Sequence, residues 1–253
     1  DITNYISLDL CRPLHVYDLD KLQGNITVRA GKAGETFEAL NDKQVKLQGD
    51  EIAIVDASGL IGLGGIMGGT STGCDENTKN VLLEVAWFDP IRIAKAGRKL
   101  GLESDARYRF ERSVDPEFLE QGAAIALKMI ADLCGGEAST IETTGQPINW
   151  QNPIAFDAAR INKRTGLNVE AAKQKDILQS LGFTFEGDTT TPPSWRADVE
   201  GSADLAEEVA RIVGYDAIPV VPLDKPAFPT NPRNAMQERA IAAKQVLAEA
   251  GLQ

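Results

Sequence analysis

The amino-acid sequence predicts an α+β protein made of a mixed-sheet domain followed by a small winged-helix-like α+β domain. Short runs rich in β-branched residues, broken by Gly, Asn and Asp turns, fill most of residues 1–90. Helical patterns bounded by Pro and Gly follow them. An uncharged stretch at 145–153, GQPINWQNP, then separates two compact parts. We therefore divide the chain into 1–146, 147–222 and 223–253.

Strands are predicted in the first domain at 26–29, 44–47, 52–56 and 81–87. The last of them, VLLEVAW, is an apolar run typical of a buried strand. Helices are predicted from Pro90 to Leu100 and from Asp115 to Cys134. Proline favours the first turn of each, and glycine follows each end. A further strand is expected at 139–143.

The second domain is predicted to combine helices with short strands. The expected order is a strand, helices at 157–164 and 168–181, two strands joined by a turn, and a helix at 202–213. Four prolines at 222–232 indicate a linker. An amphipathic helix at 234–250 is expected to begin a further, truncated domain. With no initiator Met at its start, the chain is expected to be a fragment of a longer protein.

The net charge of the chain limits which partners its overall electrostatic field can attract. It has 26 Lys and Arg against 37 Asp and Glu, a formal net charge of −11. Such a chain repels phosphates, so any RNA contact must be local or come from partner chains. Cys11, Cys74 and Cys134 have no metal-like spacing and fit a reducing cytoplasm. No apolar run is long enough to span a bilayer, so no membrane partner is expected.

The most basic stretch lies between Arg92 and Arg112, with seven basic residues against three acids. The favoured interpretation is a solvated helix face with internal ion pairs. A local phosphate-binding patch is the alternative.

Carboxylates gather at the start of the last helix of the second domain. Ser202 is expected to cap this helix. The acids at i, i+3 and i+4 on one face are Asp204, Glu207 and Glu208. Together with Asp198, six residues upstream of Asp204, they would form a hard oxygen site for Mg²⁺ or Ca²⁺. The spacing alone favours the other interpretation, an acidic first turn that complements the helix dipole.

One histidine and two glycines are candidates for chemistry in the first domain. His15, within RPLHVYD, is the only histidine, and it is either a structural hydrogen-bonding residue or one that orients a water. The stretch LGGIMGGTSTG lacks the Walker lysine and the G-x-G-x-x-G order, so it is not a nucleotide loop. It predicts either a tight bend or backbone groups at Gly68 and Gly69 that hold a substrate oxygen or a water.

Glu84 is the one acid in the apolar strand predicted at 81–87. A buried carboxylate needs a partner, or its pKa rises. The partner is either a nearby arginine or a substrate hydroxyl that donates to Glu84. A site of the second kind discriminates strongly, because a ligand without the hydroxyl leaves the carboxylate unpaired. No residue pattern indicates a covalent nucleophile beside it.

Motifs along nearly the whole chain resemble the beta subunit of bacterial phenylalanine–tRNA ligase. In the first domain they are T-N-Y, P-L-H-x-Y-D, G-I-M-G-G, L-L-E-x-A-x-F-D-P and G-L-x-S-D-A-x-x-R-F-E-R-x-V-D-P. In the second domain they are W-R-x-D and D-L-x-E-E-V-A-R-x-x-G-Y-D-x-I-P. The first set is similar to the editing domain of that family, and the second to the segment that closes its metal-binding accessory domain.

The resemblance implies a proofreading activity, the hydrolysis of tyrosine wrongly esterified to phenylalanine tRNA. Glu84 would then accept the hydrogen bond of the tyrosine hydroxyl, and Gly68 and Gly69 would present backbone groups to the aminoacyl moiety or the attacking water. The other matching residues are Thr3, Asn4 and His15 around the ester end, and Ser104 and Ala106 on the amino-acid side.

The resemblance also implies a cofactor and partners. The Mg²⁺ ligands of the family match Asp198, Asp204, Glu207 and Glu208. The partner is an alpha subunit that holds the synthetic site, in a cytoplasmic α₂β₂ tetramer that joins phenylalanine to its tRNA with ATP; the chain itself has no ATP site. Three positions depart from the family pattern, with Ser104 for the common Thr, and Cys11 and Arg12 for the usual Gly and Gln.

Two other functions compete with proofreading. One is a non-catalytic module that positions tRNA and contacts other subunits, and intact Glu84, His15 and glycines argue against it. The other is a free-standing deacylase, which the accessory domain and the truncated final helix argue against.

Overall fold

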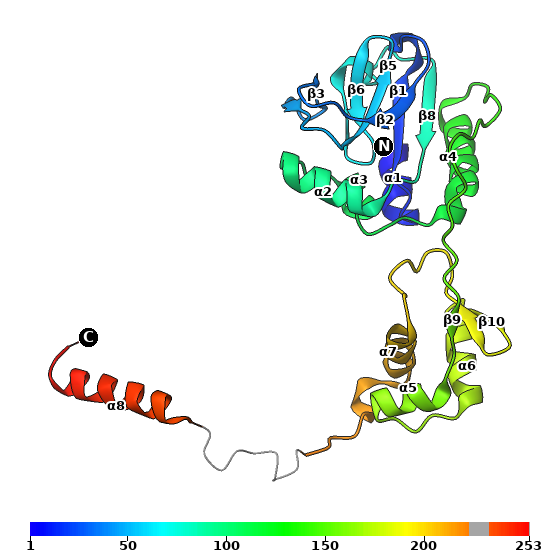
Figure 1. Ribbon diagram of the computed structural model, residues 1–253. Coiled ribbons are helices and arrows are strands. Elements are labelled where there is room, and N and C mark those ends of the chain that lie inside the picture. Colours follow the sequence, from blue (N-terminus) through cyan, green and yellow to red (C-terminus); the bar gives the residue numbers. More distant parts are fainter. Residues whose placement is uncertain (223–232, 253) are drawn as a thin grey trace.

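The computed structural model describes residues 1–222 and 233–252 (Figure 1). The strands of the first domain are β1 (Leu14–Asp18), β2 (Thr27–Ala30), β3 (Thr36–Glu38), β4 (Gln44–Lys46), β5 (Ile52–Asp56), β6 (Gly59–Leu63), β7 (Met67–Gly68) and β8 (Val81–Val85). Its helices are α1 (Ile2–Leu10), α2 (Pro90–Leu100), α3 (Asp105–Phe110) and α4 (Leu119–Cys134), with short 3₁₀ turns at Leu19–Lys21, Thr70–Thr72 and Pro116–Phe118.

Within the described residues, every strand pair of the first domain is antiparallel. Strands β2, β5, β6 and β7 form one sheet in that order, while β1 pairs with β8 and β3 with β4. The prediction of a mixed sheet is therefore wrong. The chain from β2 to β7 contains no α-helix, whereas a parallel pair needs a long crossover that is usually helical.

Helices α1 and α3 lie where the sequence predicts none. Helix α1 buries Ile6 and ends at Cys11, whose φ of 51° is in the left-handed region. A glycine would adopt that conformation without steric cost. Helix α3 begins after Ser104, whose side chain accepts a hydrogen bond from the N–H of Arg107 at 3.0 Å. The strand expected at 139–143 does not form, because these exposed residues have no partner strand.

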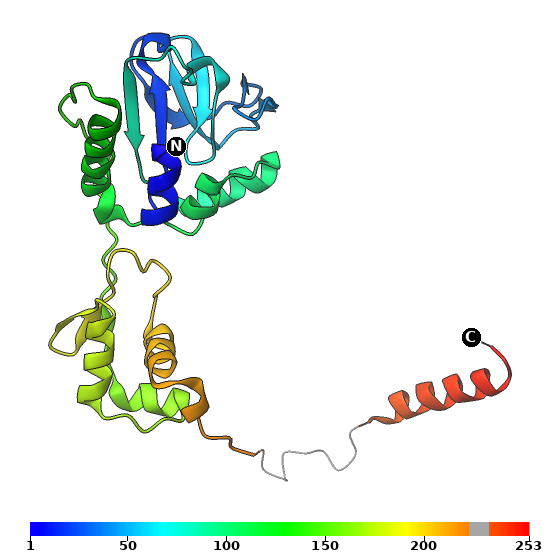
Figure 2. The ribbon, with the colours of Figure 1, turned by 180° about the vertical axis from the view of Figure 1, so that it is seen from behind.

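Helices flank the β1–β8 pair, and α4 packs beside both β8 and α1 (Figure 2). Arg12, which is 1% exposed, fixes the start of β1 to this region. Its guanidinium donates to the carbonyls of Ala86, at 3.1 Å, and Asp115. Burial lowers the pKa of Arg12 to about 10, which leaves it charged at neutral pH.

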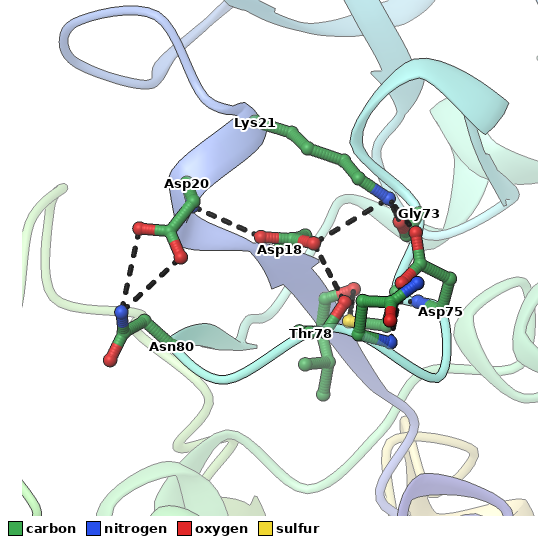
Figure 3. A network of polar contacts seen from close by, with 10 residues as sticks. Asp18, Asp20, Lys21, Gly73, Asp75, Thr78 and Asn80 are labelled. Carbon is green, nitrogen blue, oxygen red and sulfur yellow. Dashed lines mark hydrogen bonds and ion pairs between the residues drawn. The ribbon is translucent and has the colours of Figure 1, made fainter.

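A polar network fixes the far end of β1 to the loop before β8 (Figure 3). The buried carboxylate of Asp18 accepts a hydrogen bond from the Thr78 hydroxyl at 2.6 Å. Lys21 reaches Asp75 at 2.7 Å and Asp18 at 3.5 Å. Asn80 donates its side-chain amide to Asp20 at 3.2 Å. These contacts hold the register in which β1 and β8 face each other.

The second domain contains β9 (Ile154–Ala155), α5 (Ala158–Thr165), α6 (Ala171–Ser180), β10 (Thr184–Glu186), β11 (Thr189–Thr191), α7 (Ser202–Val213) and a 3₁₀ turn at Tyr215–Ala217. Its antiparallel sheet has the order β10-β11-β9. The helices enclose a core of their own, with Ile161, Leu178 and Leu205 almost fully buried. The predicted order of elements in this domain is confirmed.

Two details of the second domain differ from the prediction. Helix α6 begins at Ala171 rather than 168, because the side chain of Asn162 hydrogen-bonds both the N–H and the carbonyl of Val169. The N-cap of α7 is Gly201, so Ser202 is the first helical residue and not the cap.

Helix α8 (Ala235–Glu249) is capped by the side chain of Asn234, as the pattern at 234–250 predicts, and it buries none of its residues. The linker predicted at 222–232 lies, from 223 on, outside the described residues. In the part of the chain that the structure describes, every helix is too short or too polar to cross a membrane.

Candidate functional site

The β1–β8 pair brings the predicted His15 and Glu84 together. The two residues are direct partners in the antiparallel register, so their side chains project from the same face. Tyr17 lies two residues after His15 and therefore shares that face. The sequence prediction of the site missed Tyr17, although the period of two in a strand places it beside His15.

His15 is half-buried, and its Nε2 is a buried atom without a hydrogen-bond partner among the described residues. Its ring meets that of Tyr17 edge to face, with centroids 4.4 Å apart. Burial lowers the pKa of His15 to about 4. The imidazole is therefore neutral at pH 7, and it can either accept or donate a proton in a hydrogen bond.

Gly68, at the end of β7, lies against the His15 ring. A Cβ at Gly68 would stand 2.7 Å from Nε2 of His15, closer than real contacts allow. Gly69 packs against the backbone instead, and a Cβ there would stand 2.6 Å from the carbonyl oxygen of Ile61. Its N–H donates to that carbonyl at 2.8 Å, so the sheet already uses the N–H predicted to face a substrate.

Glu84 binds a phenol within the protein itself. Its Oε2 accepts a hydrogen bond from the hydroxyl of Tyr17 at 2.6 Å. Burial raises the pKa of Glu84, and the hydrogen bond from Tyr17 partly opposes this rise. Burial and the nearby carboxylate both raise the pKa of Tyr17, so the phenol keeps its proton. The arginine that the sequence offers as an alternative partner of Glu84 makes no such contact in the described residues.

The remaining predicted site residues lie on helix α1 and at the start of helix α3. Ser104 donates its hydroxyl to the carbonyl of Ile66 at 2.6 Å, which fixes α3 to the turn before β7. Ala106 is half-buried against the first core. Thr3 and Asn4 lie on α1, which packs beside β1, and neither side chain hydrogen-bonds another described residue.

The four predicted metal ligands do not converge. Arg196 joins two of them, donating to Asp198 at 2.7 Å and to Glu208 at 3.0 Å. Glu208 is 5% exposed and also pairs with Arg211 at 2.6 Å. These arginines lower the pKa of Glu208, Arg196 most strongly.

The other two acids have different surroundings. Asp204 accepts hydrogen bonds from the backbone N–H groups of Glu200 and Gly201 at the start of α7, and Glu207 is exposed. Across residues 1–222 and 233–252, no group of three or more His, Cys, Asp or Glu side chains is arranged to hold a metal ion.

Most basic side chains of the stretch from Arg92 to Arg112 bind groups within the first domain. Arg107 and Arg112 both pair with Glu111, at 3.1 and 2.9 Å, which confirms the internal ion pairs expected there. Arg92 and Lys99 donate to backbone carbonyls of the turn before β5. Two shallow cavities of about 260 and 250 Å³ flank α2, and none of the predicted site residues lines them.

Two parts of the chain match family models of known proteins. Residues 1–135 match the family model described as the B3/4 domain, and residues 154–215 match that of the tRNA synthetase B5 domain. These matches define a tRNA synthetase module in which a B3/4 domain precedes a B5 domain. The chain is 48% identical over its whole length to a beta subunit of phenylalanine–tRNA ligase, and it belongs to that family.

The curated relatives are beta subunits of phenylalanine–tRNA ligase. The chain is 48% identical to that of Rhodospirillum rubrum, 45% to that of Brucella suis and 44% to that of Paramagnetospirillum magneticum. Each match covers all of this chain, which spans 32% of the length of these relatives.

Among solved structures, the chain is similar to an N-terminal fragment of the phenylalanyl-tRNA synthetase beta subunit from Pyrococcus horikoshii. The match has 16% identity and a TM-score of 0.36, and it covers 82% of this chain and 62% of that one.

Proposed function

We propose that this chain carries the proofreading site of a phenylalanine–tRNA ligase and hydrolyses tyrosine wrongly esterified to phenylalanine tRNA. One observation carries the proposal. The half-buried carboxylate of Glu84 already binds a phenol hydroxyl, that of Tyr17, at 2.6 Å. A phenol hydroxyl is the one group that tyrosine has and phenylalanine lacks.

The chemistry of the two amino acids makes a second site necessary. An apolar pocket shaped for phenylalanine rejects an added hydroxyl poorly, whereas a site built to bind that hydroxyl discriminates strongly. In the proposed site, Glu84 accepts the tyrosine hydroxyl. Phenylalanine would offer no donor to the second oxygen of this carboxylate, which opposes its binding.

The other residues would act at the ester end and around the side chain. His15 is neutral, lies beside Gly68 and has no hydrogen-bond partner at Nε2 among the described residues, so it can orient a water or the ester. Thr3 and Asn4 would contact the ester end. Ser104 and Ala106 would shape the part of the site that holds the amino-acid side chain. Ser104 would do so through its hydrogen bond to the carbonyl of Ile66.

We infer that the whole enzyme is a cytoplasmic ligase of alpha and beta subunits, an α₂β₂ tetramer that uses ATP to attach phenylalanine to its tRNA. The names of the relatives, all beta subunits of this ligase, support this assembly. The second domain would be of winged-helix type, with β10 and β11 as its wing. Its three helices and three-stranded sheet support that arrangement.

The family's Mg²⁺ would use Asp198, Asp204, Glu207 and Glu208, whose oxygens suit a hard cation. Their arrangement here does not fit one. Arg196 lies between Asp198 and Glu208, where it neutralises both carboxylates. A divalent cation at this place would require Arg196 to release them.

Release of tyrosine from tyrosine-charged phenylalanine tRNA tests the proposal, with the chain alone and within the assembled ligase. The wild type should release tyrosine far faster than phenylalanine. In Glu84→Ala the ratio of the tyrosine release rate to the phenylalanine release rate should fall by a factor of about 10–100. This factor corresponds to the free energy of one hydrogen bond to a charged group. Glu142→Ala, an exposed acid without described contacts, is the matched control.

The assay also separates the competing functions. Release by the assembled ligase but not by the chain would mean that other parts deliver the tRNA. No tyrosine release by either would refute proofreading and leave a non-catalytic tRNA-positioning module.

A further inference from the structure

The hydroxyl of Tyr17 has one hydrogen-bond partner in the described structure, the Glu84 carboxylate. Tyr17 is 1% exposed and its ring is packed in the first core. The edge-to-face contact with His15 restrains the ring from a second side. The phenol is therefore held in place before any substrate arrives, and its only polar atom is aimed at Oε2 of Glu84.

The second oxygen of the carboxylate is in a different situation. Oε1 of Glu84 receives no hydrogen bond from the described residues, yet it is not one of their fully buried unpaired atoms. It is thus open to another donor. A carboxylate accepts several hydrogen bonds, so a donor at Oε1 need not displace the phenol from Oε2.

We propose that Tyr17 is a positioning residue for specificity: its hydroxyl fixes Oε2 of Glu84, so that Oε1 is the oxygen that reads the substrate hydroxyl. The inference rests on the proposed proofreading function. Without the Tyr17 hydroxyl, the carboxylate could turn about its terminal bond, and Oε2 would compete with Oε1 for the same donor. Tyr17 touches neither the ester nor the attacking water in this arrangement.

The substitution Tyr17→Phe isolates this role, because it keeps the packed ring and removes only the hydroxyl. In the assembled ligase, we expect kcat/KM for tyrosine release to fall about tenfold, mainly through a higher KM. Phenylalanine release should not change, since phenylalanine does not use Oε1. Tyr215→Phe, which removes an exposed hydroxyl in the second domain, should match the wild type.

A double-mutant cycle with Glu84→Gln shows whether Tyr17 acts through Glu84. If it does, adding Tyr17→Phe to Glu84→Gln should have no further effect on selectivity. Thermal unfolding of each variant checks that the domain is folded. A purely structural role would instead lower the release of both amino acids by the same factor.

The possible failures are distinct. If the wild type releases no tyrosine, both the proofreading function and the role of Tyr17 are refuted. If the wild type discriminates and Tyr17→Phe keeps its selectivity, only the role of Tyr17 is refuted. Equal losses for the two amino acids, or additive effects in the double mutant, also overturn it.

Discussion

Gly68 leaves room for the imidazole of His15 and for little else. The strand at this point is extended, so any residue could adopt the backbone, and the constraint is purely one of space. A methyl group would displace the ring of His15, which has no hydrogen bond within the described residues to resist the movement. The identity of one residue is thus set by the position of another, 53 residues away in the sequence (68 − 15).

The substitution Gly68→Ala should impair proofreading more than folding. We expect overpacking to cost about 1–3 kcal/mol of unfolding free energy, because the ring can shift. Tyrosine release should fall at least tenfold, since His15 leaves its place. Gly73→Ala is the control, because its Cβ would make ordinary contacts. Full activity in Gly68→Ala would show that His15 needs no fixed position.

At the scale of elements, the network around Asp18 sets how β1 meets β8. The hydrogen bond from Thr78 is the main reason why the pKa of Asp18 is lowered, with smaller help from Asp20 and Lys21. A carboxylate whose pKa is lowered by folding stabilises the fold above its ordinary pKa of about 4. This stabilisation is lost as the pH falls through the lower pKa of the folded state.

We therefore predict a pH-dependent effect for Asp18→Asn. At pH 7 the variant should unfold at a lower urea concentration than the wild type, and the difference should shrink between pH 5 and pH 3. Urea unfolding at several pH values measures it, with the exposed Asp176→Asn as control. A difference that is constant with pH would mean that the charge of Asp18 is not involved.

Sequence patterns predict helices and strands more reliably than they predict tertiary contacts. The end signals at Pro90 and Gly101 give α2 correctly, because capping is local. The sequence around Ile2 gives no such signal for α1, since its only buried residue, Ile6, depends on a distant surface. The same limit applies to the site. Resemblance predicts Glu84 and His15, whereas the phenol of Tyr17 becomes relevant only once β1 and β8 are paired.

At the scale of the whole molecule the net charge is strongly acidic, but a buried acid is neutralised by neighbouring arginines. The chain has a formal net charge of −11, yet the buried Glu208 lies between Arg196 and Arg211. The family resemblance implies that the four carboxylates converge, whereas their spacing alone favours an acidic first turn. The return of Arg196 across twelve residues to Glu208 is a tertiary contact that spacing does not reveal.

The chain should therefore fold without a divalent cation. EDTA or millimolar Mg²⁺ should leave its thermal unfolding midpoint unchanged, because Arg196 already supplies positive charge to two of the four carboxylates. Arg196→Ala should lower the midpoint and make it rise with Mg²⁺, by exposing the acids to the cation. A midpoint several degrees higher for the wild type in Mg²⁺ would contradict this prediction.

The residues of the site come from two separate sheets, His15 and Glu84 from the β1–β8 pair and Gly68 from the edge of the four-stranded sheet. No strand ladder joins the two sheets in the described residues, and at the site the side chain of His15 fills the seam between them, against Gly68. The width of this seam at the site therefore depends on the side chains that fill it. Substitutions of residues that line the seam would change how large a side chain the site admits. The hydrogen bonds that stabilise each sheet would stay intact.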